Sequence, residues 1–99
     1  MIAYLVTRHD GMLEWARRRG FAATVIAHID PHEMQPGDAV YGNFPLHIAA
    51  ALCARGVAVW ELVMTLTPEQ RGQSLSADDM ERAGAHFVRY FVREAPRQD

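Results

Sequence analysis

The feature that most constrains this chain is a series of short, uniformly apolar runs with turn-forming residues between them. The runs fall at residues 2–6, 23–29, 39–41 and 57–66. They are short for helices, and they do not alternate apolar with polar side chains as half-buried strands do. Strands that are buried on both faces are typical of a mostly parallel sheet flanked by helices. We therefore expect an α/β fold, and 99 residues leave room for one domain.

Two segments between these runs predict helices. The first covers residues 12–19, with Asp10 as a candidate N-terminal cap and Gly20 as a stop. The second covers residues 46–55 and follows Pro45, a residue type that suits the first helical position. Each predicted helix connects one expected strand to the next, as in a βαβ unit.

A third helix is predicted after the polar loop at residues 67–76. Ser76 is its candidate cap. Beyond it, residues at helical spacing form an apolar stripe that consists of Met80, Ala83, Gly84, Phe87, Val88 and Phe91, and His86 falls beside this stripe. The expected order of elements is therefore β-α-β-β-α-β-α.

Composition excludes several classes of function. A net charge of −2 excludes a protein that grips long nucleic acid through bulk positive charge. All ten basic residues are arginine, so no lysine is available for a Schiff base or a P-loop. The single cysteine, Cys53, cannot form an internal disulfide, which is typical of the reducing cytoplasm. No apolar run reaches the roughly 18 residues of a membrane helix, and charges follow the first run too soon for a signal peptide. We expect a cytoplasmic location and no membrane partner.

The turn after the first expected strand is the strongest candidate site. In open parallel sheets ligands bind at the carboxyl ends of the strands, near the point where the strand order reverses. This turn offers the hydroxyl of Thr7, the guanidinium of Arg8 and the imidazole of His9, and Gly11 follows them. These groups and a helix N-terminus all suit an anionic oxygen, and imidazole can move a proton near neutral pH. The alternative is a solvated turn whose Asp10 caps the helix.

The turn after the third expected strand is the matching place. Gly42 would let the backbone approach a ligand closely, and Asn43 could hydrogen-bond a base or a phosphate; a plain turn is the alternative. His47 lies just inside the next helix, and Arg71 follows the fourth expected strand as a further candidate cation. Glu61, inside an apolar run, suggests an edge strand or a dimer contact.

A metal site is a weaker hypothesis. His28, Asp30 and His32 have the spacing of ligands on one face of a strand. Pro31 interrupts a strand at that point, and no Cys-x-x-Cys pair supports a metal. We expect no metal and no other cofactor.

Several of these motifs together closely resemble one protein family. They are Thr7-Arg8-His9-x-Gly11-x-x-Glu14-Trp15, His28-x-Asp30, Pro36-Gly37-Asp38-x-Val40-x-Gly42-x-x-Pro45 and Arg71-Gly72-x-x-Leu75-Ser76. The family is a small stand-alone CRISPR-associated family of type III systems, grouped with the ring nucleases. The resemblance implies one Rossmann-like, CARF-like domain over residues 1–95 with a tail at 96–99. It also implies a homodimer that binds a cyclic oligoadenylate, above all cyclic tetra-adenylate, and cleaves it without metal.

The resemblance also suggests roles for the candidate residues. Arg8 and His9 stand where the motif is strongest and would be catalytic. Arg8 would stabilise charge on the phosphorane, and His9 would act as general base or acid when a ribose 2′-OH attacks its own phosphodiester. The expected ligand-binding residues are Thr7, Gly11, Gly42, Asn43 and Arg71.

Three other functions remain open. The same fold would serve a protein that binds the messenger without cleaving it. Residues 5–9 also resemble the Arg-His strand end of histidine phosphatases, although Asp10 stands where that motif has glycine. The third alternative is a purely structural or assembly role, against which the polar groups at two strand ends argue weakly.

Overall fold

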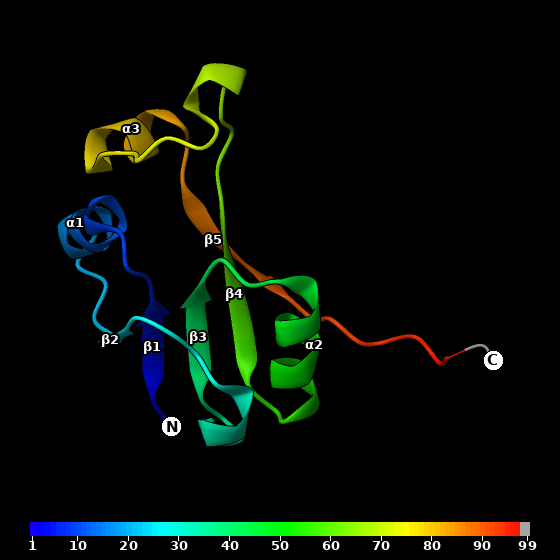
Figure 1. The fold of residues 1–99 in the computed structure, drawn as a ribbon. Helices are drawn as coiled ribbons and strands as arrows, with labels where there is room; N and C mark the ends of the chain where they lie inside the picture. The colour runs from blue at the N-terminus through cyan, green and yellow to red at the C-terminus, as the bar shows by residue number, and fades with distance from the viewer. Residues whose placement is uncertain (98–99) are drawn as a thin grey trace.

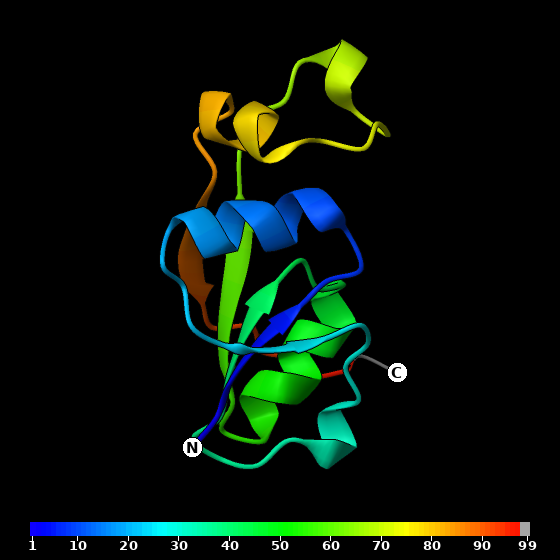
Figure 2. The same ribbon diagram turned by 90° about the vertical axis from the view of Figure 1, so that its left-hand side faces the viewer.

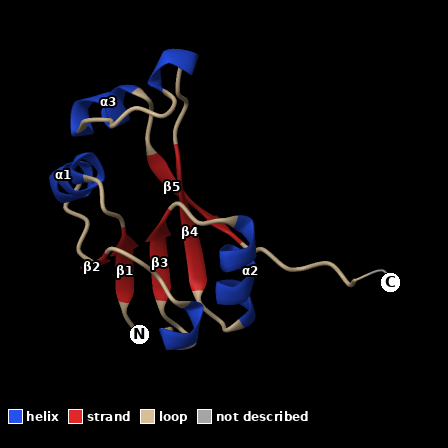
Figure 3. Ribbon diagram, viewed as in Figure 1, coloured by secondary structure: helices blue, strands red, loops and turns tan. Residues whose placement is uncertain are grey.

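The computed structural model describes residues 1–97 and shows a five-stranded sheet with helices on both faces (Figures 1 and 3). Residues 98–99, part of the expected tail at 96–99, lie outside the described chain. The strands are β1 (Ala3–Val6), β2 (Thr24–Ile26), β3 (Ala39–Gly42), β4 (Ala58–Val63) and β5 (His86–Tyr90). The helices are α1 (Asp10–Arg18), α2 (Leu46–Ala54) and α3 (Ala77–Arg82), with 3₁₀ turns η1 (Pro31–Glu33) and η2 (Pro68–Gln70).

The strands lie in the order β2-β1-β3-β4-β5. The first four are parallel, and only β5 runs antiparallel to its neighbour β4. This mostly parallel sheet, wound from β1 outward in both directions, makes the protein a Rossmann-like α/β domain and confirms the expected fold class.

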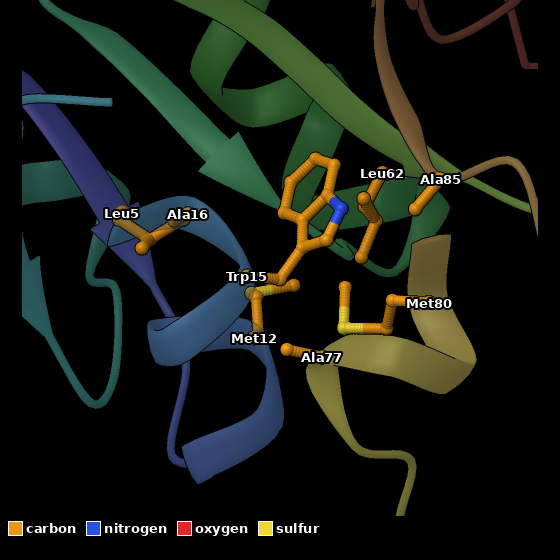
Figure 4. Packing of buried hydrophobic residues seen from close by; sticks show 8 residues of the cluster. All are labelled: Leu5, Met12, Trp15, Ala16, Leu62, Ala77, Met80 and Ala85. Carbon is orange, nitrogen blue, oxygen red and sulfur yellow. The ribbon is translucent and has the colours of Figure 1, made fainter. Parts of the chain in front are cut away.

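Two apolar cores cover the two faces of the sheet. On one face α1 crosses in front of the strands, and α3 packs against α1 beyond their ends (Figure 2). Trp15 of α1 lies at the centre of this core, and its exposed fraction is 2%. Its neighbours in the core include Met80 of α3 and Leu62 of β4 (Figure 4). On the other face α2 buries Leu52 against Val40 and Val59 of the sheet.

Ion pairs at the surface join α1 to α3. Arg18 contacts Asp78 at 2.6 Å, and Arg19 contacts Glu81 at 2.9 Å while its guanidinium lies 5.1 Å from the centre of the Trp15 ring. The hydrogen bond from Arg18 lowers the pKa of Asp78, and the one from Arg19 lowers the pKa of Glu81. Exposed pairs of this kind contribute little each, so the apolar core does most to hold the two helices together.

The prediction of a long last helix is wrong. Ser76 caps α3 as expected, its hydroxyl accepting from the Asp79 N–H at 3.1 Å, but the helix ends at Arg82. Gly84 has a φ of +71°, and the Ala85 N–H donates to the Met80 carbonyl, which closes the helix. His86, Phe87 and Val88 then lie in β5, which pairs along its whole length with β4, and Phe91 follows the strand. The order of elements is therefore the expected one followed by a fifth strand.

The other elements differ from expectation at their ends. Pro31 begins the short 3₁₀ turn η1, and β2 and β4 are shorter than the apolar runs that contain them. Pro45 occupies the N-cap of α2 rather than its first turn. Within the described residues no helix is long and apolar enough to cross a membrane.

Candidate functional site

The two strand ends singled out in the sequence lie side by side. Val6, the last residue of β1, is paired with Gly42, the last residue of β3, and Gly42 is paired on its other side with Glu61 of β4. The chain continues from β1 into α1 on one face of the sheet and from β3 towards α2 on the other (Figure 1). The two turns therefore flank the point where the strand order reverses.

The turn after β1 is held by its own backbone and by Thr7. The Thr7 N–H donates to the Ile26 carbonyl of β2 at 3.0 Å, and the Thr7 hydroxyl accepts from the His9 N–H at 3.0 Å. Thr7 is 8% exposed, so its hydroxyl serves this turn. Asp10 is not the cap: His9 occupies the N-cap of α1, and Asp10 lies in the first turn.

Arg8 and His9 project from this turn into solvent. Both are exposed, and neither side chain has a hydrogen bond or ion pair within residues 1–97. No side chain caps α1, which leaves the first N–H groups of the helix without a side-chain acceptor. Free N–H groups at a helix N-terminus beside an unpaired guanidinium favour an anion.

Gly11 has a packing role that the sequence did not reveal. A Cβ at this position would lie 1.9 Å from the Leu75 carbonyl oxygen, so the segment leading into α3 crosses directly over the start of α1. Only glycine permits this approach. Gly11 thus brings a third loop to the edge of the site, while a direct contact with a ligand stays a prediction.

Gly42 and Asn43 form the second side of the site. A Cβ on Gly42 would lie 2.7 Å from the Val6 carbonyl oxygen, so glycine lets the two strand ends close up. The Asn43 amide Nδ2 donates to the Glu61 carboxylate and to the Leu62 carbonyl, each at 3.0 Å. The amide nitrogen of Asn43 is therefore engaged in holding the loop.

Glu61 is the residue that sequence reasoning misread. It lies on β4, between β3 and β5, so the interpretation as an edge strand is wrong. Its carboxylate accepts from Asn43 and, through Oε1, from the Phe44 N–H at 3.2 Å. The available signal was a single acid within an otherwise apolar run, which indicates a specific hydrogen-bonding duty in a buried strand.

The remaining candidates lie at different distances from this centre. His47 is exposed in the first turn of α2, after the Gly42–Pro45 turn. Arg71 follows η2, which stands above α1 and away from the sheet in Figure 2. Arg71 is exposed, and its side chain makes no hydrogen bond in the described chain. Its participation in the site stays a prediction.

The three residues of the metal hypothesis do not form a cluster. Asp30 caps η1 by accepting from the His32 N–H at 3.0 Å, and η1 turns the chain between His28 and His32. Within residues 1–97 no group of three or more His, Cys, Asp or Glu side chains could hold a metal ion.

The fold and the site define a class of protein: a small Rossmann-like domain with cationic and imidazole groups exposed at its switch point. The sequence of residues 4–93 matches the family model described as "Putative CRISPR-associated protein (Cas_VVA1548)". The chain belongs to this CRISPR-associated family, as the motifs suggested. No curated protein and no solved structure matches it.

Proposed function

We propose that this protein is a ring nuclease that binds a cyclic oligoadenylate, principally cyclic tetra-adenylate, and opens it without a metal ion. The observation that carries the proposal is the juxtaposition at the switch point of the Arg8–His9 turn with the Gly42–Asn43 turn. Membership of a CRISPR-associated family supports the choice of messenger, because type III CRISPR systems signal with such rings. The enzyme would act in the cytoplasm and switch the signal off.

The charges and hydrogen-bond donors of the site support binding of a phosphodiester. Arg8 offers forked donors, and the N-terminus of α1 offers backbone N–H groups beside it. Each nucleotide of the ring carries one negative charge. A few local donors therefore suffice, and the net charge of −2 is no obstacle.

The chemistry needs only groups that this turn can supply. The ribose 2′-oxygen bonds to the adjacent phosphorus, and the bond from phosphorus to the 5′-oxygen breaks. The 2′-hydroxyl gives up its proton to a base, and the departing 5′-oxygen takes one from an acid. The products are a 2′,3′-cyclic phosphate and a 5′-hydroxyl. His9 serves one of the two proton transfers, and Arg8 stabilises the charge that develops on the phosphorane oxygens.

A second copy of the chain is part of the proposal. A two-fold axis would present two Arg8–His9 turns to a ring that can share that symmetry. The surface proposed for this contact is that of α2. None of its nine residues is Asp, Glu, Lys or Arg, and Leu46 is 74% exposed, so the helix presents an apolar surface to solvent. The groove between α2 and residues 91–97 has a volume of about 920 Å³. Its charged lining consists of Arg93, Glu94 and Arg97, of which Glu94 and Arg97 pair with each other at 3.5 Å.

The test is a single-turnover assay with cyclic tetra-adenylate and identification of the products. Arg8→Ala should slow ring opening about 10²-fold or more, as loss of a transition-state donor does. His9→Ala should slow it by about 10²–10⁴-fold. Arg89→Ala and His32→Ala, which change exposed residues on β5 and η1, are the matched controls and should keep the rate.

The outcomes separate the proposal from its rivals. Unchanged rates in both Arg8→Ala and His9→Ala would place the site elsewhere. Activity should survive EDTA, and loss on chelation would restore the metal hypothesis at His28. An intact ring held in stoichiometric complex would indicate a binding protein instead. One observation favours this second candidate: within residues 1–97 no side chain hydrogen-bonds to the His9 imidazole to orient it.

A further inference from the structure

A second pocket lies beside the candidate site, beyond the end of β2. It has a volume of about 310 Å³. Its apolar lining is formed by Ile26, Ile29 and Met34. The chain from β2 to η1 walls it on the face of the sheet that α2 covers further along, and Figure 2 shows this segment turning down from the end of β2.

The end of β2 places one end of this pocket, at His28, next to the Arg8 turn. Ile26 is paired with Val6, and its carbonyl accepts from the Thr7 N–H at 3.0 Å. His28 therefore follows β2 by two residues just as Arg8 follows β1 by two. Adjacent parallel strands lie about 4.8 Å apart. The His28 end of the pocket thus lies beside the Arg8 turn, whereas its Glu33 end lies towards the other edge of the sheet, beside the N-terminus in Figure 1.

The wall of the pocket is built in advance of any ligand. Arg55, at the end of α2, donates to the Met34 carbonyl at 2.9 Å and to the His32 carbonyl at 3.3 Å. The Asp38 carboxylate holds the next residue by accepting from the Gln35 N–H at 2.9 Å. The segment from His32 to Gln35 is therefore fixed by two separate side chains, Arg55 and Asp38. Such pre-organisation lowers the conformational entropy that is lost when a ligand binds.

The polar lining suits a nucleoside and not a phosphate. Tyr4 and His28 supply two flat rings on which a base can stack, and Glu33 and Asp30 supply carboxylate oxygens. Carboxylates repel a phosphate but accept from the donors of adenosine, which are the N6 amino group and the ribose hydroxyls. These acids do not converge with a histidine as metal ligands do.

We propose that this pocket binds one adenosine of the cyclic oligoadenylate, base and ribose together, while a phosphodiester of the same ring lies at Arg8. The inference rests on the proposed function for the identity of the ring, and it adds the subsite that selects adenine. Glu33 and His28 are the residues that recognise the nucleoside. Within residues 1–97 neither side chain makes a hydrogen bond, so a substitution of either one should leave the fold intact.

The experiment uses the full chain and two probes. His28→Ala and Glu33→Gln are assayed for opening of cyclic tetra-adenylate, and each should raise KM about tenfold with kcat within twofold of the original. The original protein and both variants are then titrated with adenosine 5′-monophosphate by NMR. In the original protein the chemical-shift changes should cluster at residues 26–34. In each variant the affinity for adenosine 5′-monophosphate should fall about tenfold. His32→Ala and Glu69→Gln, which change exposed residues outside the pocket, are the controls.

The two readouts distinguish failure of the subsite from failure of the nuclease. If Arg8→Ala abolishes ring opening while both pocket variants keep KM, the subsite is wrong and the nuclease stands. If the ring is never opened but adenosine 5′-monophosphate still shifts residues 26–34, the nuclease is wrong and the nucleoside site stands. Shifts confined to other residues overturn the subsite whatever the enzyme does.

Discussion

At the scale of single residues, Asp38 shows how one buried acid organises the start of the sheet. It is 3% exposed, and its carboxylate accepts from the Ile2 N–H at 3.0 Å and from the Gln35 N–H at 2.9 Å. The bond from Gln35, followed by the bond from Ile2, lowers the pKa of this carboxyl from its ordinary value of 3.8. The ionised form thus joins the residue before β1 to the loop before β3.

This lowered pKa gives a pH dependence of stability with a definite sign. A carboxyl with a lower pKa in the folded state stabilises it fully above the unfolded value, near pH 4, and the contribution is lost as the pH falls through the folded pKa. We expect Tm to drop steeply below pH 4, and Asp38→Asn to lower Tm at pH 7 and to flatten this drop. Thermal unfolding from pH 2 to pH 7 measures both. Asp10→Asn, at an exposed acid, is the control, and an equally steep drop in Asp38→Asn would contradict the role.

The structural roles of Glu61 and Gly11 could not be predicted from the sequence. The sequence shows an acid in an apolar run and a glycine after an expected strand. Their partners, the Phe44 N–H and the Leu75 carbonyl, lie 17 and 64 residues away along the chain. Duties that depend on such distant partners follow from the fold and not from local pattern.

At the scale of elements, the early part of the chain was predictable and the last part was not. For β1, α1, β3 and α2, the apolar runs and the turn residues between them agreed with one another, and the structure confirms these elements within a few residues, although His9 and not Asp10 caps α1. In β5 the same apolar side chains fit both a helical stripe and a strand. Pairing with β4 and the stop at Gly84 decide for the strand, because tertiary contacts override local propensity.

The contact between α1 and the segment before α3 is tested by Gly11→Ala. The added methyl group would lie 1.9 Å from the Leu75 carbonyl oxygen, so the backbone must shift. Overpacking of this kind costs about 1–3 kcal/mol. In a chain of this size we expect Tm to fall by roughly 4–8 °C for each kcal/mol.

The control for Gly11→Ala is Gly72→Ala. There a Cβ meets no atom within 4 Å, and the positive φ is the one source of strain. Its cost should stay at about 1 kcal/mol. An unfolding scan in which Gly11→Ala is as stable as the original protein would show that Leu75 does not rest on α1.

At the scale of the whole molecule, the position of the candidate site followed from strand order, whereas the residues that complete it did not. The short apolar runs implied a parallel sheet, and a parallel sheet implied a site at its switch point. The structure joins β1 and β3 there, with Arg8, His9 and Asn43 at one edge. The pocket at the end of β2 was out of reach, because its wall depends on Arg55 from a helix far along the chain.

The proposed two-fold assembly makes the last prediction, at the face of α2. Leu46 and Phe91 are 74% and 79% exposed on either side of the groove, so a second copy would bury both. Leu46→Asp and Phe91→Asp should each convert the dimer to a monomer in light scattering. Leu46→Asp should keep Tm, because an acid in the first turn of a helix is favourable. Ring opening should slow in both variants, since each site then lacks its symmetric partner.

The control is Val25→Asp, which changes another exposed apolar residue and should stay dimeric. An original protein that is monomeric with and without the ring would exclude the assembly and leave one Arg8–His9 turn to do the chemistry alone.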